Sequence, residues 1–419
     1  MFKKLPRKRG PKLRKRRMHH PESLLIENIG RLVTMQPGRG RLGRLGVIRN
    51  AAIRCMHGRI TWFGPDGKEP VLPRTVGEVR IDADGGVVMP GLIDSHTHLV
   101  HGQYKKDTFG KPDFLPIMRA TQESHFDVLF EHASERADEV LRHGVTTIEV
   151  KSGYGYAEES ELKLLNVVRA LGDNHVERFI PTLFVGRVLS KARASRVNDI
   201  IKKIIPAVRA DHLAQFFDVC VDEHAFRRDE ARKMIAAAQK SKMLVKVHAD
   251  QFSDRGGAQL AAEVGAVSAD HLEYISDTGI AALAKAGTTA VILPGTTFFA
   301  GATRYAPARK MIDAGVRVAI ASNYNPDTTP CLDLFLVATI AITQMGLTPE
   351  EALLGVTLNA AHAIAAEHDI GSIALGKRAD LVVLGVDHEI VPLYRYGASF
   401  LRTVVCEGEV VWRHHGYNL

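Results

Sequence analysis

Residues 244–273 read LVKVHADQFSDRGGAQLAAEVGAVSADHLE, and they contain two short apolar runs, 244–247 and 266–269, each of which leads into polar residues. Short apolar runs bounded in this way are typical of strands that are buried on both faces, as in parallel sheets. The sequence has eight candidate strands of this kind. The other six runs lie at 87–93, 146–150, 179–185, 217–221, 290–293 and 316–321.

Amphipathic segments separate the eight runs. Strands that alternate with helices predict a parallel sheet, and eight β/α units predict a (β/α)8 TIM barrel, which is an α/β fold. An open, doubly wound sheet is the alternative, but that fold would more often have a glycine-rich phosphate-binding turn after its first strand. The sequence has no such turn after its first run. The clearest amphipathic segments lie at 129–143, 159–171, 229–241 and 278–286.

The two ends of the chain carry short candidate strands punctuated by Gly and Pro instead. Strands left alone at either end would expose their edges, so we expect the two ends to pair into one small β-sandwich domain. The predicted organisation is a tail at 1–21, a composite β domain at 22–87 plus 369–419, and a catalytic barrel at 88–368. The candidate strands lie at 23–26, 31–34, 51–54, 59–63, 78–82, 380–384 and 404–411.

The formal net charge of +8 comes from the N-terminus. Of the 55 Lys and Arg residues, ten lie within residues 1–17, so the rest of the chain has 45 against 47 Asp and Glu, a net charge of −2. We expect a disordered tail, or an upstream start codon with the true start at Met18. A nucleic-acid partner is not expected, and any such contact would be limited to this tail.

Composition favours a packed protein of the reducing cytoplasm. Hydrophobic residues make up 45% and charged residues 24% of the 419 residues. No apolar stretch approaches the ~20 residues of a membrane span, and no apolar run follows the basic N-terminus as in a secretory signal. The four cysteines are scattered and form no CxxC pair, which argues against a disulfide framework. They are Cys55, Cys220, Cys331 and Cys406.

Histidines follow three of the predicted barrel strands, at the end of the barrel where active sites lie. His96 and His98 are two residues apart on an extended chain, so both side chains leave the same face. His248 follows the fifth run and His271 the sixth. Taken alone, His96-Thr97-His98 also fits a pair of surface histidines. Together, the four imidazoles predict a metal site, and their nitrogen atoms suit zinc or iron.

The eighth run leads into Asn323. A hydrolytic metal site needs a carboxylate at such a position, to bind the ion and to accept a proton from the attacking water. The amide of Asn323 can coordinate through its oxygen, but it cannot take up a proton.

Long segments of the chain resemble the imidazolonepropionases of the metal-dependent amidohydrolase superfamily. The similarity runs from about residue 22 to the end and is densest at 244–384. The segments that carry it are PGLIDSHTHLV, TTIEVKSGYG, VKVHADQFSDRGGAQLAAEVGAVSADHLEYISD, AVILPGTTFF, LTPEEALLGVTLNAA and GSIALGKRADLVVL.

This resemblance implies one divalent or trivalent metal ion, zinc or iron. His96, His98 and His248 would be ligands, and Asn323 stands where the family has a ligand aspartate. His271 would orient the attacking water or polarise the substrate carbonyl. These roles make His271 and Asn323 candidate catalytic residues.

The resemblance also implies a set of substrate-binding residues. Tyr154 matches a substrate-binding tyrosine, and Gln251 matches a position that meets the imidazolone ring, which makes it a candidate catalytic residue as well. Asn325 and Thr328 match residues that hold the amino-acid end of the substrate.

Three other candidate substrate-binding positions differ from the family. Lys105 replaces an arginine and loses bidentate recognition of a carboxylate. Arg187 replaces a histidine. Asp327 replaces a glycine and brings a carboxylate near the expected propionate pocket.

The implied reaction is hydrolysis of the cyclic amide of 4-imidazolone-5-propanoate to N-formimidoyl-L-glutamate in histidine degradation, and Asn323 would impair it. The expected partners are this small-molecule substrate and a second copy of the chain, as a homodimer. Two alternatives are hydrolysis of another cyclic amide and an inactive homologue that binds metal and ligand. Asn323 marks an inactivated variant, a homologue with another base such as His271 or Asp250, or a relative that no longer turns over.

Overall fold

The computed structural model describes residues 21–36, 43–71, 77–102, 114–188 and 193–414. The predicted tail at 1–21 therefore lies almost wholly outside the described residues. Among the described residues, no helix is both long and apolar enough to cross a membrane.

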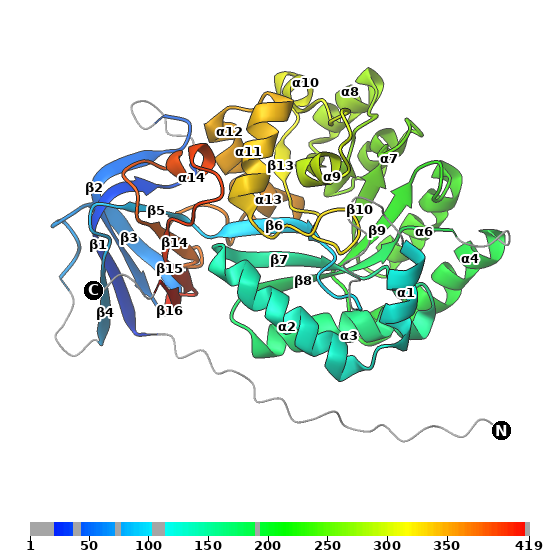
Figure 1. Ribbon diagram of the computed structural model, residues 1–419, viewed down its shortest axis with the longest axis horizontal. Helices are drawn as coiled ribbons and strands as arrows, with labels where there is room; N and C mark the ends of the chain where they lie inside the picture. The colour runs from blue at the N-terminus through cyan, green and yellow to red at the C-terminus, as the bar shows by residue number, and fades with distance from the viewer. Residues whose placement is uncertain (1–20, 37–42, 72–76, 103–113, 189–192, 415–419) are drawn as a thin grey trace.

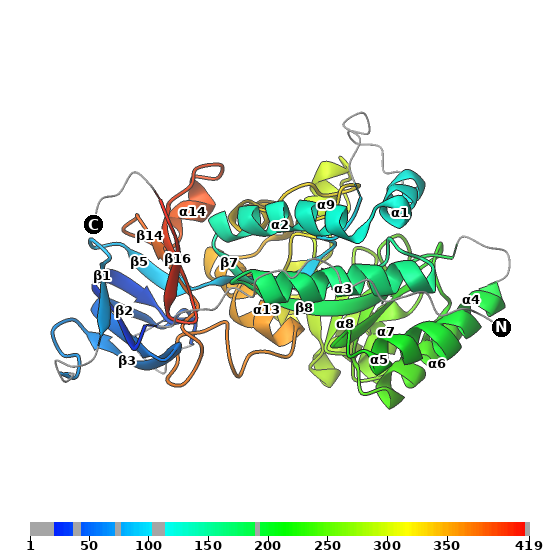
Figure 2. The same cartoon turned by 90° about the horizontal axis from the view of Figure 1, so that it is seen from below.

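Eight parallel strands follow one another in sequence order around a barrel, and helices lie outside it (Figures 1 and 2). The predicted TIM barrel is therefore confirmed. Strands β7 and β9 are buried along their whole length, as expected for strands covered on both faces. The barrel strands are β6 (Leu92–Thr97), β7 (Val145–Lys151), β8 (Arg178–Val185), β9 (Phe216–Val221), β10 (Leu244–Ala249), β11 (Ser268–His271), β12 (Thr289–Ile292) and β13 (Val318–Ile320).

Some of the helices begin or end at recognisable signals, such as a side-chain cap or a glycine after the last turn. One of them, α12, begins after Thr348 with a capping box, in which the Thr348 hydroxyl accepts from the Glu351 amide and the Glu351 carboxylate accepts from the Thr348 amide. The helices are α1 (Phe114–Glu123), α2 (Phe126–Arg142), α3 (Glu158–Asn174), α4 (Arg193–Asp199), a π-helical turn (Ile200–Ile204), α5 (Ile205–Ala210), α6 (Arg228–Lys240), α7 (Gly257–Glu263), α8 (Asp277–Ala286), α9 (Pro294–Phe299), α10 (Ala308–Asp313), α11 (Leu334–Met345), α12 (Pro349–Gly355), α13 (Leu358–Ala363) and α14 (Val391–Tyr394).

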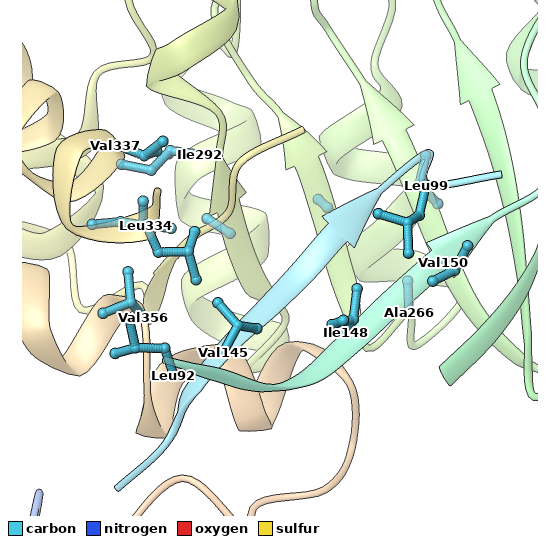
Figure 3. Close-up of a cluster of buried hydrophobic side chains, with 14 of the residues drawn as sticks. Leu92, Leu99, Val145, Ile148, Val150, Ala266, Ile292, Leu334, Val337 and Val356 are labelled. Carbon is cyan, nitrogen blue, oxygen red and sulfur yellow. The ribbon is translucent and has the colours of Figure 1, made fainter. Parts of the chain in front are cut away.

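Apolar side chains fill the space between the barrel strands and the helices. Figure 3 shows part of this core, where Leu92 and Val145 from β6 and β7 lie near Val356, with Leu334 and Val337 of α11 beside them. The helices are therefore held to the barrel by a continuous hydrophobic layer.

The barrel closes between its last and first strands through the residues that follow β13. The amide of His98 donates to the Tyr324 carbonyl at 2.7 Å, and the amide of Asn323 donates to the His96 carbonyl at 3.0 Å. The carboxylate of Asp94 accepts from the Ser322 amide at 3.1 Å. Closure therefore depends on the same short segments that carry the predicted metal ligands.

A second, mixed sheet draws its strands from both ends of the chain, as predicted, and it has a buried core of its own. In Figure 1 its blue and red strands lie side by side, away from the barrel. The division of the chain into domains at residues 21, 87 and 368 stays a prediction. The sheet comprises β1 (Ser23–Val33), β2 (Val47–Met56), β3 (Arg59–Pro65), β4 (Glu78–Asp82), β5 (Val87–Pro90), β14 (Leu381–Leu384), β15 (Leu401–Cys406) and β16 (Glu409–Arg413).

Four predicted runs are divided differently in the structure, and one of them, at 404–411, spans the turn between the antiparallel strands β15 and β16. The runs at 23–26 and 31–34 form one strand, β1, with a register shift between Ile26 and Ile29. The run at 87–93 belongs to two sheets, because β5 pairs with β1 and β14 while β6 begins the barrel. The division falls at Gly91, where any Cβ atom would collide with the side chain of Thr146.

Candidate metal site and substrate pocket

Three histidines converge at the carboxyl ends of β6, β10 and β11. Each offers a ring nitrogen, and these atoms lie within 4.8 Å of one another. The residues are His96, His248 and His271, all of them buried. The rings of His248 and His271 are the nearest pair, with centroids 3.9 Å apart. The predicted convergence of strand-end histidines is thus present in the structure.

His98 lies beside this trio. Its ring centroid is 5.7 Å from that of His96, and it packs edge-on against Phe184 at 5.3 Å and Tyr154 at 5.7 Å. The closest trio therefore contains His271, which we did not expect as a ligand, instead of His98. The assignment of His98 as a metal ligand stays a prediction.

Five buried polar atoms at this place have no hydrogen-bond partner among the described residues. A buried lone pair without a partner is costly, and such atoms call for an ion or water. Imidazole nitrogen and amide oxygen together suit zinc or iron, so the donor set fits the expected metal. The atoms are Nε2 of His96, Nδ1 of His98, Nδ1 of His248, Nε2 of His271 and Oδ1 of Asn323.

Burial keeps the histidines neutral, which is the form that binds a metal. It lowers the pKa of His96 well below its usual value, and the ammonium of Lys151 lowers it further. Burial, followed by the same ammonium, lowers the pKa of His98 to about 3. The pKa of His248 is lowered by burial and then by His271. All three side chains therefore present a lone pair near neutral pH.

Asp270 fixes the orientation of His96. Its Oδ2 accepts from Nδ1 of His96 at 2.6 Å, which leaves the Nε2 lone pair facing the site. Burial opposes ionisation of Asp270, but the ammonium groups of Lys246 at 3.5 Å and Lys151 at 3.6 Å, with the His96 bond, hold its pKa well below the usual range. A carboxylate behind a ligand histidine fixes the tautomer and raises the basicity of the ligand.

Below the site, the barrel interior contains five fully buried charged side chains where TIM barrels usually have apolar layers. Lys151 donates to Glu149 at 2.9 Å and to Asp218 at 2.8 Å, and Lys246 donates to the Ser95 carbonyl at 2.7 Å. Unpaired, each ion would cost several kcal/mol in such surroundings. The five are Glu149, Lys151, Asp218, Lys246 and Asp270.

Sequence analysis missed this charged layer, although the sequence carries a signal for it. Glu149 and Lys151 occupy alternate positions of β7, and Lys246 interrupts the apolar run at 244–247. Alternate residues of a strand share one face. Charged residues at such positions of a strand expected to be buried therefore indicate an inward-facing ionic layer.

Asn323 is held with its amide oxygen free. Its Nδ2 donates to Oγ1 of Thr296 at 2.8 Å, and its backbone is in the left-handed region with φ of 51°. The side chain therefore offers a neutral oxygen ligand at the position where the resemblance predicts a carboxylate.

A cavity of about 400 Å³ opens above these atoms. His98, His248, His271 and Asn323 form part of its wall. The structure also brings together all the predicted substrate-binding residues that it describes, while Lys105 lies outside the described residues. Those in the wall are Tyr154, Arg187, Gln251, Asn325, Asp327 and Thr328.

The polar wall is arranged around the rings of Phe114 and Tyr154. The guanidinium of Arg187 lies 4.6 Å from the centre of the Phe114 ring. Burial raises the pKa of Tyr154, as does the charge of Asp327, so its hydroxyl stays protonated and can donate. Elsewhere in the cavity wall, Oε1 of Gln251 lies 3.4 Å from Nε2 of His248.

The side chains of Asn325 and Asp250 are hydrogen-bonded to backbone groups of their own loops. Asn325 accepts from the amides of Asp327 at 2.9 Å and Thr328 at 2.6 Å, and it donates to the Asn323 carbonyl at 2.7 Å. Asp250 accepts three backbone amides, each at 3.0 Å, around the start of α7. Asp250 is therefore poorly suited as the alternative base, which leaves His271.

The chain matches the family described as "Amidohydrolase family" over residues 87–411. Its fold is shared with a zinc-containing adenosine deaminase from Xanthomonas campestris, at a TM-score of 0.72 and 20% identity over 93% of each chain. A triazine hydrolase variant has a TM-score of 0.74 at 18% identity, over 94% of this chain and 95% of that one. The protein belongs to the amidohydrolase family.

Comparison of whole sequences defines the group within that family. The imidazolonepropionase of Geobacillus kaustophilus is 40% identical over 391 residues, which are 88% of this chain and 92% of the relative. That of Parabacteroides distasonis is 38% identical over 412 residues, 92% of this chain and 98% of the relative. Within the amidohydrolases, the chain belongs to the imidazolonepropionase family, and the resemblance in its motifs is confirmed.

Proposed function

We propose that this protein hydrolyses the ring amide of 4-imidazolone-5-propanoate to N-formimidoyl-L-glutamate, a step of histidine degradation. The observation that carries the proposal is the group of unpartnered nitrogen and oxygen atoms that opens onto a cavity of about 400 Å³. Membership of the imidazolonepropionase family supports this substrate above other cyclic amides.

We infer that His96, His98, His248 and Asn323 hold one zinc or iron ion. A bound metal would polarise the ring carbonyl and lower the pKa of water toward ~7. Asp270 orients His96 for this role through the 2.6 Å hydrogen bond.

His271 is the proposed proton acceptor. Its Nε2 has no partner among the described residues, and its Nδ1 lies 3.4 Å from Oε1 of Glu273. The attacking water would give its proton to Nε2, and Glu273 would stabilise the charged ring. His271 would then deliver the proton to the ring nitrogen as the C–N bond breaks, a task that the amide of Asn323 cannot perform.

The remaining wall residues would bind the substrate. Gln251 would meet the imidazolone ring, since it lies beside His248. Arg187 and the protonated hydroxyl of Tyr154 would receive the propionate, with Lys105, Asn325 and Thr328 around it. Asp327 adds a carboxylate to the wall of this part of the pocket, and the nearby charge of Arg187 would offset its repulsion of the propionate.

We also propose a homodimer in the cytoplasm, without a nucleic-acid partner. The dimer is what the resemblance to the imidazolonepropionases implies. The scattered cysteines, which are all free thiols in the structure, suit a reducing compartment.

The test is the loss of imidazolone absorbance with fresh 4-imidazolone-5-propanoate, for the metal-loaded protein and its Asn323→Asp variant. Turnover by either protein supports the substrate, and a variant faster by roughly 10²–10⁴-fold would show that Asn323 impairs proton transfer. Similar rates for both would show that His271 suffices. No turnover by either protein overturns the proposed substrate.

A further inference from the structure

The loop that carries Tyr154 is held from below by one carboxylate. Glu161, in the first turn of α3, accepts the Gly153 amide at Oε2 at 2.8 Å and the Tyr156 amide at Oε1 at 2.6 Å. The two bonds bracket Tyr154 on both sides. Glu161 is buried, so water competes little for these amides.

The glycines of this loop allow it to lie directly on the helix. Gly153 has a φ of 110°, a conformation that L side chains rarely adopt. At Gly155, a Cβ atom would meet the backbone nitrogen of Glu161 at 2.5 Å. The backbone of the loop therefore follows the start of α3 closely, and the Glu161 carboxylate is within reach of both amides.

The loop that carries Gln251 is held in the same manner from a different strand. Asp222, directly after β9, accepts the amides of Gln251 at 2.7 Å and Phe252 at 2.9 Å on one oxygen. Its other oxygen accepts from the Glu223 amide at 2.7 Å and from the Ser253 hydroxyl at 3.3 Å. One buried carboxylate thereby joins the loops that follow β9 and β10.

We propose that Glu161 and Asp222 are positioning residues that hold Tyr154 and Gln251 against the substrate by fastening the backbone of their loops. Each of these carboxylates accepts two backbone amides of one loop, so a single side chain fixes the loop at two points. The inference rests on the proposed function, because Tyr154 and Gln251 face the substrate only if the cavity binds it. Among the described residues, neither carboxylate hydrogen-bonds to His96, His248 or His271.

Kinetics test the substrate side of this inference. In Asp222→Ala and Glu161→Ala we expect the KM for 4-imidazolone-5-propanoate to rise roughly tenfold or more, since a loosened loop pays more ordering entropy on binding. Zinc affinity, measured by chelator competition, should stay within about twofold. The variants Asp222→Asn and Glu161→Gln keep one acceptor oxygen, so their KM should rise less. They replace the Ala variants in the experiment if an Ala variant does not fold.

Matched controls lie beside each carboxylate. Ser253→Ala removes the 3.3 Å bond to Asp222 and the 3.1 Å bond that the hydroxyl accepts from the exposed Arg255, and it leaves both loop amides bound to Asp222. Glu159→Gln removes an exposed charge from the same turn of α3 as Glu161. Both should leave KM within about twofold of the parent protein.

Amide hydrogen exchange tests the fastening without any turnover. The amides of Gln251 and Phe252 should exchange at least tenfold faster in the Asp222 variants, and those of Gly153 and Tyr156 in the Glu161 variants. Unchanged exchange, or faster exchange with an unchanged KM, overturns the inference. If the parent protein does not hydrolyse the substrate, the proposed function fails, and exchange alone then decides whether the carboxylates fasten the loops.

Discussion

Asp270 occupies an unusual position for a fully buried carboxylate. It accepts from His96 at 2.6 Å and from the Ser268 hydroxyl at 2.5 Å, with two lysine ammonium groups close by. Asp270 would therefore not bind the metal itself, and its charge would influence a bound metal through the ring of His96.

Asp270→Asn should weaken metal binding by about 10–100-fold, the usual effect of losing the partner of a ligand histidine. The asparagine amide oxygen can still accept a hydrogen bond from His96. The substitution removes the negative charge, however, and leaves the ammonium groups of Lys151 and Lys246 with one fewer carboxylate nearby. Zinc affinity measured by competition with a chelator provides the readout. Ser268→Ala, which removes the neutral neighbour of the same carboxylate, is the control. Equal affinity in Asp270→Asn and the parent would contradict this role.

At the residue scale, the sequence predicted that the strand-end histidines converge, but it did not predict the charged residues around them, and their roles stay predictions. His96, His248 and His271 follow apolar strands, so strand periodicity alone places them at one end of a barrel. Which three nitrogens come closest depends on the twist of each strand, which a one-dimensional pattern does not contain. The engagement of Asp250 by three backbone amides, of Arg255 and of the first two residues of α7, also depends on a loop conformation that no periodicity reports.

Among the elements, α12 depends on its N-terminal capping box. The Thr348 hydroxyl and the Glu351 carboxylate satisfy two amides that the helix itself cannot pair, and Glu351 also receives Arg309 at 2.8 Å. The helix packs near the closure of the barrel, since the Val356 carbonyl that follows it accepts from the Ile93 amide.

Thr348→Ala should lower the free energy of unfolding by about 0.5–2 kcal/mol, the range for loss of an N-cap side chain. Urea unfolding followed by circular dichroism measures the change. Thr348→Ser retains a capping hydroxyl and should recover most of the stability. If the Ala and Ser variants unfold at the same urea concentration as the parent, the cap does not stabilise α12.

At the element scale, the alternation of strands and helices predicted the barrel correctly. The run at 87–93 was misread as one strand because apolarity continues through Gly91. Only the close approach of Thr146, a contact with a residue far along the chain, shows that the chain changes sheets there. The strand pattern likewise could not reveal the shift in β1 between Ile26 and Ile29.

Over the whole molecule, a buried ion pair ties the small sheet to the segment before α14. Arg31 of β1 donates to both carboxylate oxygens of Glu389, at 2.5 and 2.7 Å. Helix α14 in turn contacts the barrel, where the Thr339 hydroxyl of α11 donates to the Leu393 carbonyl. Arg31 and Glu389 therefore help to join the two sheets.

This pair predicts a dependence of stability on pH. Burial would raise the pKa of Glu389, but the bonds and the charge of Arg31 prevail and hold it below the usual value. The stabilisation is therefore present above the unfolded pKa of about 4.3 and is lost as pH falls through the folded value. Glu389→Gln should be less stable than the parent at pH 7, and the difference should shrink at lower pH.

Urea unfolding at pH 7 and at about pH 3, which lies below the unfolded pKa, measures this difference. Asp387→Asn, at an exposed neighbour of the same segment, should have a much smaller effect at both values. A difference between Glu389→Gln and the parent that stays constant with pH would contradict the assignment.

Removal of metal should destabilise the whole molecule. An ion that binds only the folded chain adds about 2.7 kcal/mol when its free concentration is 100 times Kd. We therefore expect a chelator to lower the Tm of the parent protein. In a His248→Ala variant, which lacks one ligand nitrogen, the chelator should have little effect. Equal Tm values for the parent with and without chelator would contradict a bound metal.

The way the barrel closes gives this ion a mechanical role. His96 and His98 lie at the end of the first strand, Asn323 follows the last, and the two strands join through few backbone bonds. A metal held by both would act as a crosslink across this junction, and the folded ring could open there only after the ion had left. Loss of the ion would then favour opening at this one junction, so catalytic competence and the integrity of the ring would fail together.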